Sequence, residues 1–217
     1  MTTATTPADG DPTLVALVPR RSPARNALLV AIGAVVLLTA ALSPRVLQPS
    51  IDTDGTYTWS ALAGHGQTLE TIEFTARGWP ALDVRSIGEV PGARSVDAWV
   101  LTGTSARGGH AGDPTDHPSG LDFVRASFPH ADLAATRLPQ RLEDGATATL
   151  VVLWGLDDCA GLVEGRAPVL TLASVAGTAV DHQLSDFTGP AFDLRLLHEL
   201  GICPPGSGQP AVLGLDP

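Results

Sequence analysis

The stretch Ala146-Thr-Ala-Thr-Leu-Val-Val-Leu-Trp154 carries the strongest strand pattern in the chain. Its second half, from Leu150 to Trp154, contains no polar side chain. A short apolar run rich in valine and leucine, without a polar face, is typical of a strand that is buried on both sides. We therefore predict that this segment lies at the centre of a sheet.

Shorter candidate strands surround this central one, each closed by glycine, proline or aspartate turns. Residues 68–76 alternate clearly, with Ile72 and Phe74 on one face and Thr71 and Glu73 on the other, as expected for a sheet that is wet on one side. The 23 Gly and 18 Pro residues of the 217-residue chain also favour an all-β domain with many turns. The predicted strands are residues 56–62, 68–76, 82–87, 95–102, 121–128, 146–154, 168–175 and 178–184, the last two forming an antiparallel hairpin.

One helix is predicted near the carboxyl end. Thr188 can cap it, Pro190 suits its first turn, and Phe192 and Leu196 follow at helical spacing until Gly201 ends it. The rest of the domain is mainly β, although a division into two small β modules near residues 129–139 remains open.

An apolar segment lies near the amino end. Residues 27–42 contain no charge, and Thr39 is the single polar side chain. With its neighbours this segment is long enough to span a bilayer. Arg20, Arg21 and Arg25 precede it, and such an excess of arginine predicts that the amino terminus lies in the cytoplasm. The predicted organisation is a disordered cytoplasmic tail at 1–25, a transmembrane signal-anchor helix at 26–47, an extracytoplasmic domain at 50–203 and a flexible tail at 204–217.

Other readings of this segment stay open. A basic region followed by an apolar core also fits a cleaved signal peptide, although Pro44 would lie just after the cut. A twin-arginine signal built on Arg20 and Arg21 matches less well, because Ser-Pro-Ala-Arg follows the pair. A buried helix of a soluble protein is the third reading, and the arginine flank favours a membrane over it.

Cys159 and Cys203 are the two cysteines of the chain. On the outer side of a membrane such a pair is usually joined, so we predict a structural disulfide. In the chain-entropy model it would stabilise the fold by about 4 kcal/mol. A redox or catalytic thiol is the alternative, but no C-x-x-C is present, and the charges of Asp157 and Asp158 would raise the pKa of a thiol at Cys159.

The segment from Leu138 to Pro204 resembles uncharacterised membrane-anchored or exported proteins of high-GC bacteria. The resemblance rests on Leu142-Glu-Asp-Gly145, the 150–154 strand, Asp158-Cys159, the 169–184 hairpin and the stretch 194–203. It covers about a third of the chain. It implies an antiparallel, immunoglobulin-like β-sandwich with a disulfide between a strand and the chain terminus, and it implies no activity.

One loop gathers residues that could bind a metal. His110, Asp113, Asp116 and His117 fall within eight residues of a loop at 104–120. Imidazole and carboxylate groups are ligands of zinc and copper, although this spacing matches no specific signature. His and Asp are also common in such loops because they are soluble and form turns.

The net charge and the lack of catalytic motifs limit the functions that the sequence supports. A net charge of −10 disfavours nucleic acid as a partner. The sequence has no G-x-S-x-G, H-E-x-x-H or phosphate-binding glycine loop, and chance pairs of serine and histidine do not by themselves make a catalytic site. We predict a non-enzymatic, membrane-anchored extracytoplasmic module that binds a protein of the cell envelope and needs no cofactor. The alternative is an envelope hydrolase or metal-dependent enzyme that uses the loop from His110 to His117.

Overall fold

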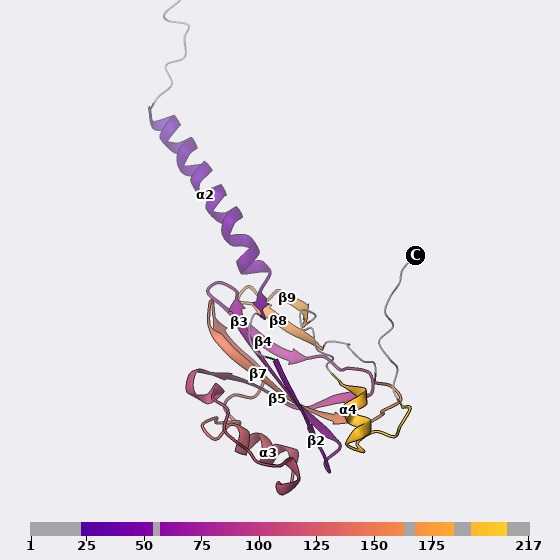
Figure 1. The fold of residues 1–217 in the computed structure, drawn as a ribbon. Helices are drawn as coiled ribbons and strands as arrows, with labels where there is room; N and C mark the ends of the chain where they lie inside the picture. Colours follow the sequence, from indigo (N-terminus) through magenta and orange to yellow (C-terminus); the bar gives the residue numbers. More distant parts are fainter. Residues whose placement is uncertain (1–22, 54–56, 163–167, 185–191, 208–217) are drawn as a thin grey trace, which may run out of the picture. The chain divides into compact units, whose positions relative to one another are not determined.

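The computed structural model describes residues 23–53, 57–162, 168–184 and 192–207, without the side chains of residues 23, 25 and 40–47. The chain divides into two compact units, Met1–Ala41 and Leu42–Pro217. All the described strands belong to the second unit, whose two sheets are shown in Figure 1. The division that the sequence left open near residues 129–139 does not occur.

Helix α2, Pro23–Leu47, coincides with the apolar segment. Its large apolar side chains between Leu28 and Leu38 are exposed. The hydroxyl of Thr39 lies 2.9 Å from the carbonyl oxygens of both Val35 and Val36. Within the described part of the chain, no helix has the length and apolar character needed to cross a bilayer. Arg20 and Arg21 lie outside the described residues, so the predicted orientation stays a prediction.

The first sheet, sheet A, has five antiparallel strands around a central pair. Strand β7 pairs with β3 on one side and with β5 on the other, which confirms the central strand predicted at 146–154. Along its other edge, β3 pairs with β2 at residues 67–72 and with β1 at residues 75–77. The strand bounds are β1 Ser50–Asp52, β2 Tyr57–Leu62, β3 Gln67–Arg77, β5 Ala93–Thr102 and β7 Thr147–Leu156.

The second sheet, sheet B, has the strand order β6-β4-β8-β9 and is also antiparallel. The predicted hairpin is confirmed, because β8 and β9 pair and Gly177 N donates a hydrogen bond to Ser174 O at 2.9 Å. Strands β1 and β6 were not predicted. The strand bounds are β4 Ala81–Ile87, β6 Gln140–Glu143, β8 Val169–Ser174 and β9 Ala179–Gln183.

The main hydrophobic core lies between the two sheets, so the domain is a β-sandwich as expected. Alternation along each strand sends every second side chain inward, and these side chains are almost all aliphatic or aromatic. Sheet A supplies Ile72, Phe74, Val100, Leu150, Val152 and Trp154, and sheet B supplies Leu82, Val84, Leu142, Leu170 and Leu172.

The outer face of sheet A carries a third layer, and here one prediction is wrong. Of residues 121–128, predicted as a weak strand, all but Phe128 belong to helix α3, Gly120–Ser127. Ser119 caps this helix: its Oγ accepts a hydrogen bond from Asp122 N at 3.2 Å and donates one to Asp122 Oδ2 at 2.6 Å. Phe123 and Val124 then lie on one helical face and pack on the sheet, which a strand pattern would not allow.

After α3 the chain passes along the edge of β5. Val100 N donates to Thr136 O at 2.9 Å, and Leu138 N donates to Ala98 O at 3.1 Å. Directly afterwards the chain enters β6 of the other sheet. One side of the sandwich is therefore closed by a continuous piece of chain.

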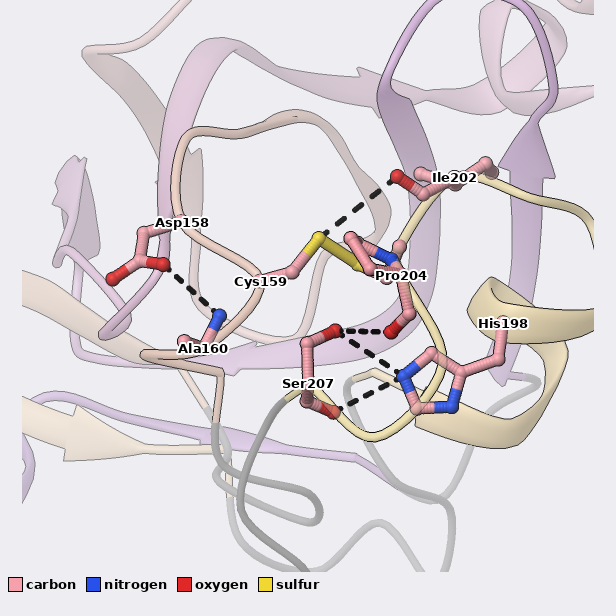
Figure 2. The surroundings of a disulfide bond; sticks show 8 residues. Asp158, Cys159, Ala160, His198, Ile202, Pro204 and Ser207 are labelled. Atoms are coloured by element: carbon pink, nitrogen blue, oxygen red, sulfur yellow. Dashed lines mark hydrogen bonds between the residues drawn. A yellow bond between two sulfur atoms is a disulfide. The ribbon is translucent and has the colours of Figure 1, made fainter.

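Cys159 and Cys203 form the predicted disulfide, with Cα atoms 5.7 Å apart (Figure 2). The residues just before Cys159 are fixed by hydrogen bonds as well as by the disulfide. The backbone N–H groups of Asp157 and Asp158 both donate to Gly92 O at 3.1 Å. Gly92 has a φ of +80°. A side chain there would begin 2.4 Å from Asp158 O, so only glycine fits.

Cys203 follows helix α4, Leu194–Glu199, which is shorter than the sequence predicted. The predicted cap Thr188 and first-turn Pro190 lie outside the described residues. In the described part the helix is capped by Asp193, whose side chain accepts a hydrogen bond from Leu196 N at 3.0 Å. Phe192 precedes the helix and packs edge-on against Trp154, with ring centroids 5.9 Å apart.

Candidate functional site

The long loop predicted between β5 and the next element is present and is tied down at two points. It contains two short 3-10 turns, η1 at Gly103–Ala106 and η2 at Pro114–Asp116. Gly109 N donates to Ser127 O of α3 at 2.6 Å. His65 Nε2 lies 3.2 Å from Pro114 O. These contacts hold the loop against both the helix and the turn between β2 and β3.

Two of the four predicted metal ligands make hydrogen bonds within the loop. Asp113 accepts hydrogen bonds from the backbone N (2.9 Å) and the hydroxyl (2.7 Å) of Thr115, which lower the pKa of its carboxyl group. His117 Nε2 donates to Ala111 O at 2.7 Å. The His117 ring also packs edge-on against Phe123, with centroids 5.4 Å apart. Both side chains therefore have a structural role in the loop.

The other two predicted ligands, His110 and Asp116, are exposed. Among the described residues, no group of three His, Cys, Asp or Glu side chains is arranged to hold a metal ion. Metal binding by His110, Asp113, Asp116 and His117, and an enzyme that would depend on it, stay predictions for which the described residues offer no preformed cluster.

A groove of about 430 Å³ opens between this loop and the outer face of sheet A. This volume lies within the range of about 300 to 1,000 Å³ that is common for ligand sites. One wall is the glycine-rich part of the loop from Gly108 to Gly112, which includes His110. Another is α3 and the residue that follows it, through Phe123, Ser127 and Phe128.

The floor of the groove is the polar end of sheet A. Its side chains come from β2, β3 and β7, at positions that alternate with core residues. Thr58 lies opposite Thr71 across β2 and β3, and their hydroxyls are hydrogen-bonded. Glu73 lies opposite Thr149 across β3 and β7. Because directly opposite residues on two strands are about 5 Å apart, the floor presents closely spaced hydrogen-bonding groups.

The groove has few ionisable side chains. Among the described residues that line it, Glu73 is the single carboxylate and His110 is the single imidazole. The sequence placed Glu73 on the polar face of its strand, which is confirmed by its exposure. The sequence does not show that a distant loop folds over this face. It therefore gave no reason to expect Glu73 and His110 to line the same groove.

Sequence reasoning also missed Glu70, which is buried in the sandwich core at 2% exposure. Trp154 Nε1 donates to Glu70 Oε2 at 2.7 Å, and the Tyr57 hydroxyl provides a second hydrogen bond. Burial raises the pKa of Glu70 to about 7, against these two bonds, which lower it. Burial and the nearby Glu70 carboxylate also raise the pKa of Tyr57. The sequence does contain a signal for this burial. Glu70 lies two residues before the core residue Ile72, so in a strand both side chains point to the same face.

A serine–histidine contact occurs beside the disulfide. His198 Nε2 lies 3.0 Å from Ser207 O and 3.3 Å from Ser207 Oγ (Figure 2). The Ser207 hydroxyl donates to Pro204 O at 2.7 Å, so its proton points away from the imidazole. An activated serine would instead donate this proton to the histidine. The contact closes a turn after Cys203.

No family model, curated protein or solved structure matches the chain. The expected kinship with membrane-anchored or exported proteins of high-GC bacteria therefore stays a prediction. The groove is the candidate site because of its own geometry: a cavity large enough for a ligand, hydroxyl groups and a carboxylate on a sheet, and a loop held over them.

Proposed function

We propose that the chain is a membrane-anchored module whose β-sandwich lies outside the cytoplasm and binds a segment of an envelope protein. The groove on sheet A is the observation that carries the proposal. It places polar groups that can fix the orientation of a ligand on three hydrogen-bonded strands, and a rigid scaffold of this kind is suited to specific binding.

Anchoring is supported by the composition of residues 27–42, which carry no charge and one polar side chain, Thr39. An uncharged apolar segment of this kind favours contact with a lipid bilayer. The hydroxyl of Thr39 is within hydrogen-bonding distance of helix carbonyls, so this polar group would not remain unsatisfied in lipid. The orientation follows from Arg20, Arg21 and Arg25, which precede the segment.

A location outside the cytoplasm is supported by the disulfide, because such bonds form and persist mainly in oxidising compartments. The anchor and the disulfide are independent features of the chain, and both agree with this location.

An immunoglobulin-like arrangement is supported by the order of the strands. In constant-type immunoglobulin domains one sheet has the order A-B-E-D and the other C-F-G. The order β2-β3-β7-β5 corresponds to the first, and β4-β8-β9 corresponds to the second, with β6 added at the edge of β4. Domains of this architecture often serve recognition at cell surfaces, in agreement with a binding role.

Site-specific photo-crosslinking in cells tests the binding role. A photoreactive residue at Ser60, on the exposed groove floor, should give a defined adduct with an envelope protein. The same residue at Arg195, which is exposed on α4 and does not line the groove, is the matched control. Adducts of equal yield at both positions, or none at Ser60, would contradict the proposal.

Fractionation and thiol labelling test the location. The full chain should sediment with membranes and resist extraction by carbonate. Cys159 and Cys203 should react with a membrane-impermeant maleimide only after reduction. Recovery in the soluble cytosolic fraction, with both thiols open to alkylation, would overturn the anchor and the location together.

A further inference from the structure

We infer that a pocket on the outer face of sheet B binds a free α-amino acid, with its carboxylate between Arg85 and Arg141 and its ammonium group on Asp83. The pocket has a volume of about 430 Å³ and is lined by Asp83, Arg85, Pro139, Gln140 and Arg141. This volume lies in the range of about 300 to 1,000 Å³ that is common for small-molecule sites. The pocket shares no lining residue with the groove on sheet A, so this is a second site.

The backbone of sheet B brings the three charged side chains together. Asp83 lies directly opposite Arg141 across β4 and β6, so both side chains point to the same face. The register between β4 and β8 shifts between Val84 and Ser86, which places Arg85 at a bulge. Bulges are frequent beside binding sites, because they redirect a side chain. Here both Arg85 and Ser86 are exposed, whereas regular alternation would turn one of them inward.

One wall of the pocket is fixed by the chain that enters β6. Pro139 has no N–H group, and the ladder between β4 and β6 ends at the pair of Val84 and Gln140. Gln140 Nε2 donates hydrogen bonds to Ala135 O at 2.7 Å and to Arg137 O at 2.9 Å. This wall is therefore held in place, and the Pro139 ring adds an apolar surface beside the charged groups.

The charged groups of the pocket are not engaged with one another. In the described part of the chain, the side chains of Asp83, Arg85 and Arg141 form no ion pair and no hydrogen bond. Most other described arginines do pair with a carboxylate, and these are Arg77, Arg94, Arg125, Arg137 and Arg195. The two guanidinium groups and the carboxylate can therefore all turn to a ligand.

This combination of charges favours a zwitterion. A simple anion would gain from the two arginines but would meet Asp83, and a simple cation would gain from Asp83 but would meet the two arginines. An α-amino acid carries a carboxylate and an ammonium group on one carbon, so it can satisfy both. Diagonal neighbours on paired strands are about 7 to 8 Å apart, so the long side chains of Arg85 and Arg141 can converge on one carboxylate.

Nuclear magnetic resonance of the isotope-labelled full chain in lipid nanodiscs tests this inference. The probe is leucine, whose side chain can pack on Pro139. Its controls are N-acetyl-leucine, which has no ammonium group, and leucine amide, which has no carboxylate. Leucine at millimolar concentration should cause saturable shifts at the backbone amides of Asp83, Arg85 and Arg141. Each control should bind about tenfold more weakly, because it loses one charge-assisted interaction.

Substitutions assign each charge of the ligand to its partner. Arg141→Gln should weaken leucine binding about tenfold, and Arg85→Gln provides a second variant if the first does not fold. Asp83→Asn should weaken the binding of leucine but not that of N-acetyl-leucine, because only leucine carries the ammonium group. Arg107→Gln removes an exposed arginine outside the pocket and should leave leucine binding unchanged.

Three results would each overturn the inference. They are the absence of saturable shifts with leucine, equal binding of leucine and either control, and full affinity in whichever pocket variant folds. Because the pocket and the groove share no lining residue, none of these results bears on the Ser60 crosslink, which tests the proposed binding function by itself.

Discussion

The outer face of sheet A has two halves that the same strands build in different ways. On β3, Leu69 is buried under α3, whereas Glu73, four residues further along the same face, is exposed on the groove floor. On β7, Leu153 lies in the apolar half and Thr149 in the polar half. Both Leu69 and Glu73 pair with β7, whereas on the other edge β2 pairs with Leu69 and its ladder ends at Ile72. The two halves therefore differ in side-chain chemistry and in the pairing at this edge.

This comparison shows how one sheet can both stabilise the fold and present a site. Apolar side chains on the outer face recruit a covering helix, because their burial is favourable by about 25 cal/mol for each Å² removed from water. Hydroxyl side chains on the same face give no such gain, and several of them line the groove. Changes that remove the cover, or that alter one half alone, test whether the two halves act separately.

The largest effect is expected from the helix that covers the apolar half. Phe123→Ala removes a ring that is 8% exposed and packs on the sheet, and should lower the free energy of unfolding by about 3 kcal/mol. Denaturant titration followed by circular dichroism measures it. A loss below about 1 kcal/mol would show that α3 does not depend on this contact.

The inner face of the same sheet gives a pH-dependent effect. The folded pKa of Glu70 is about 7, against about 4.5 without burial. Between these values the folded state holds a proton that the unfolded state has lost, so the contribution of Glu70 to stability is largest below about pH 4.5 and is lost as the pH rises through 7. At 1.36 kcal/mol per pK unit the total loss is about 3 kcal/mol.

Unfolding titrations from pH 4 to pH 8 measure this loss, and Glu70→Gln is the control. The amide cannot ionise and keeps an oxygen that can accept the hydrogen bond from Trp154 Nε1. The variant should therefore lose most of the pH dependence. An identical pH profile in both proteins would assign the effect to another group.

A smaller effect is expected at the start of α3. Ser119→Ala removes the side chain that accepts from Asp122 N and should lower the free energy of unfolding by about 1 kcal/mol. Ser119→Thr keeps a hydroxyl that can accept from Asp122 N and donate to Asp122 Oδ2, and it should retain most of the stability. Hydrogen exchange of the first turn of α3 should accelerate in the alanine variant, and unchanged exchange would argue against the cap.

The smallest effect is expected in the polar half. Ser60→Ala removes an exposed hydroxyl from the groove floor, and the free energy of unfolding should change by less than about 0.5 kcal/mol. The same denaturant titration measures it. A loss above about 1 kcal/mol would show that the polar half also contributes to the stability of the fold, and the comparison between the halves would fail.

The sequence predicted the elements that carry a strong local pattern. The run from Leu150 to Trp154 identified the central strand, the alternation around Ile72 identified β3, and Ala176-Gly177 identified the hairpin. The pairing of Cys159 with Cys203 followed from their number and the expected compartment. For the strands and the hairpin, the determining information lies within a few residues of the element itself.

The errors have a tertiary origin. Residues 121–128 contain both alternating and helical spacings of apolar residues, and packing on sheet A decides for the helix. The short strand β6 forms by pairing with the edge of β4. No local sequence pattern in residues 140–143 predicts this pairing. The groove joins β2, β3 and β7 to a loop that is distant from β3 in the sequence. Local sequence patterns identify the side chains but do not show that they lie together.

The passage of residues 136–138 along β5 bears on self-association. An open strand edge is a template on which a second copy can polymerise, and natural sheets protect such edges. Here the bonds from Val100 to Thr136 and from Leu138 to Ala98 occupy that template with the chain's own backbone. Amyloid-like stacking or strand exchange through β5 would first require residues 136–138 to dissociate from the edge of β5.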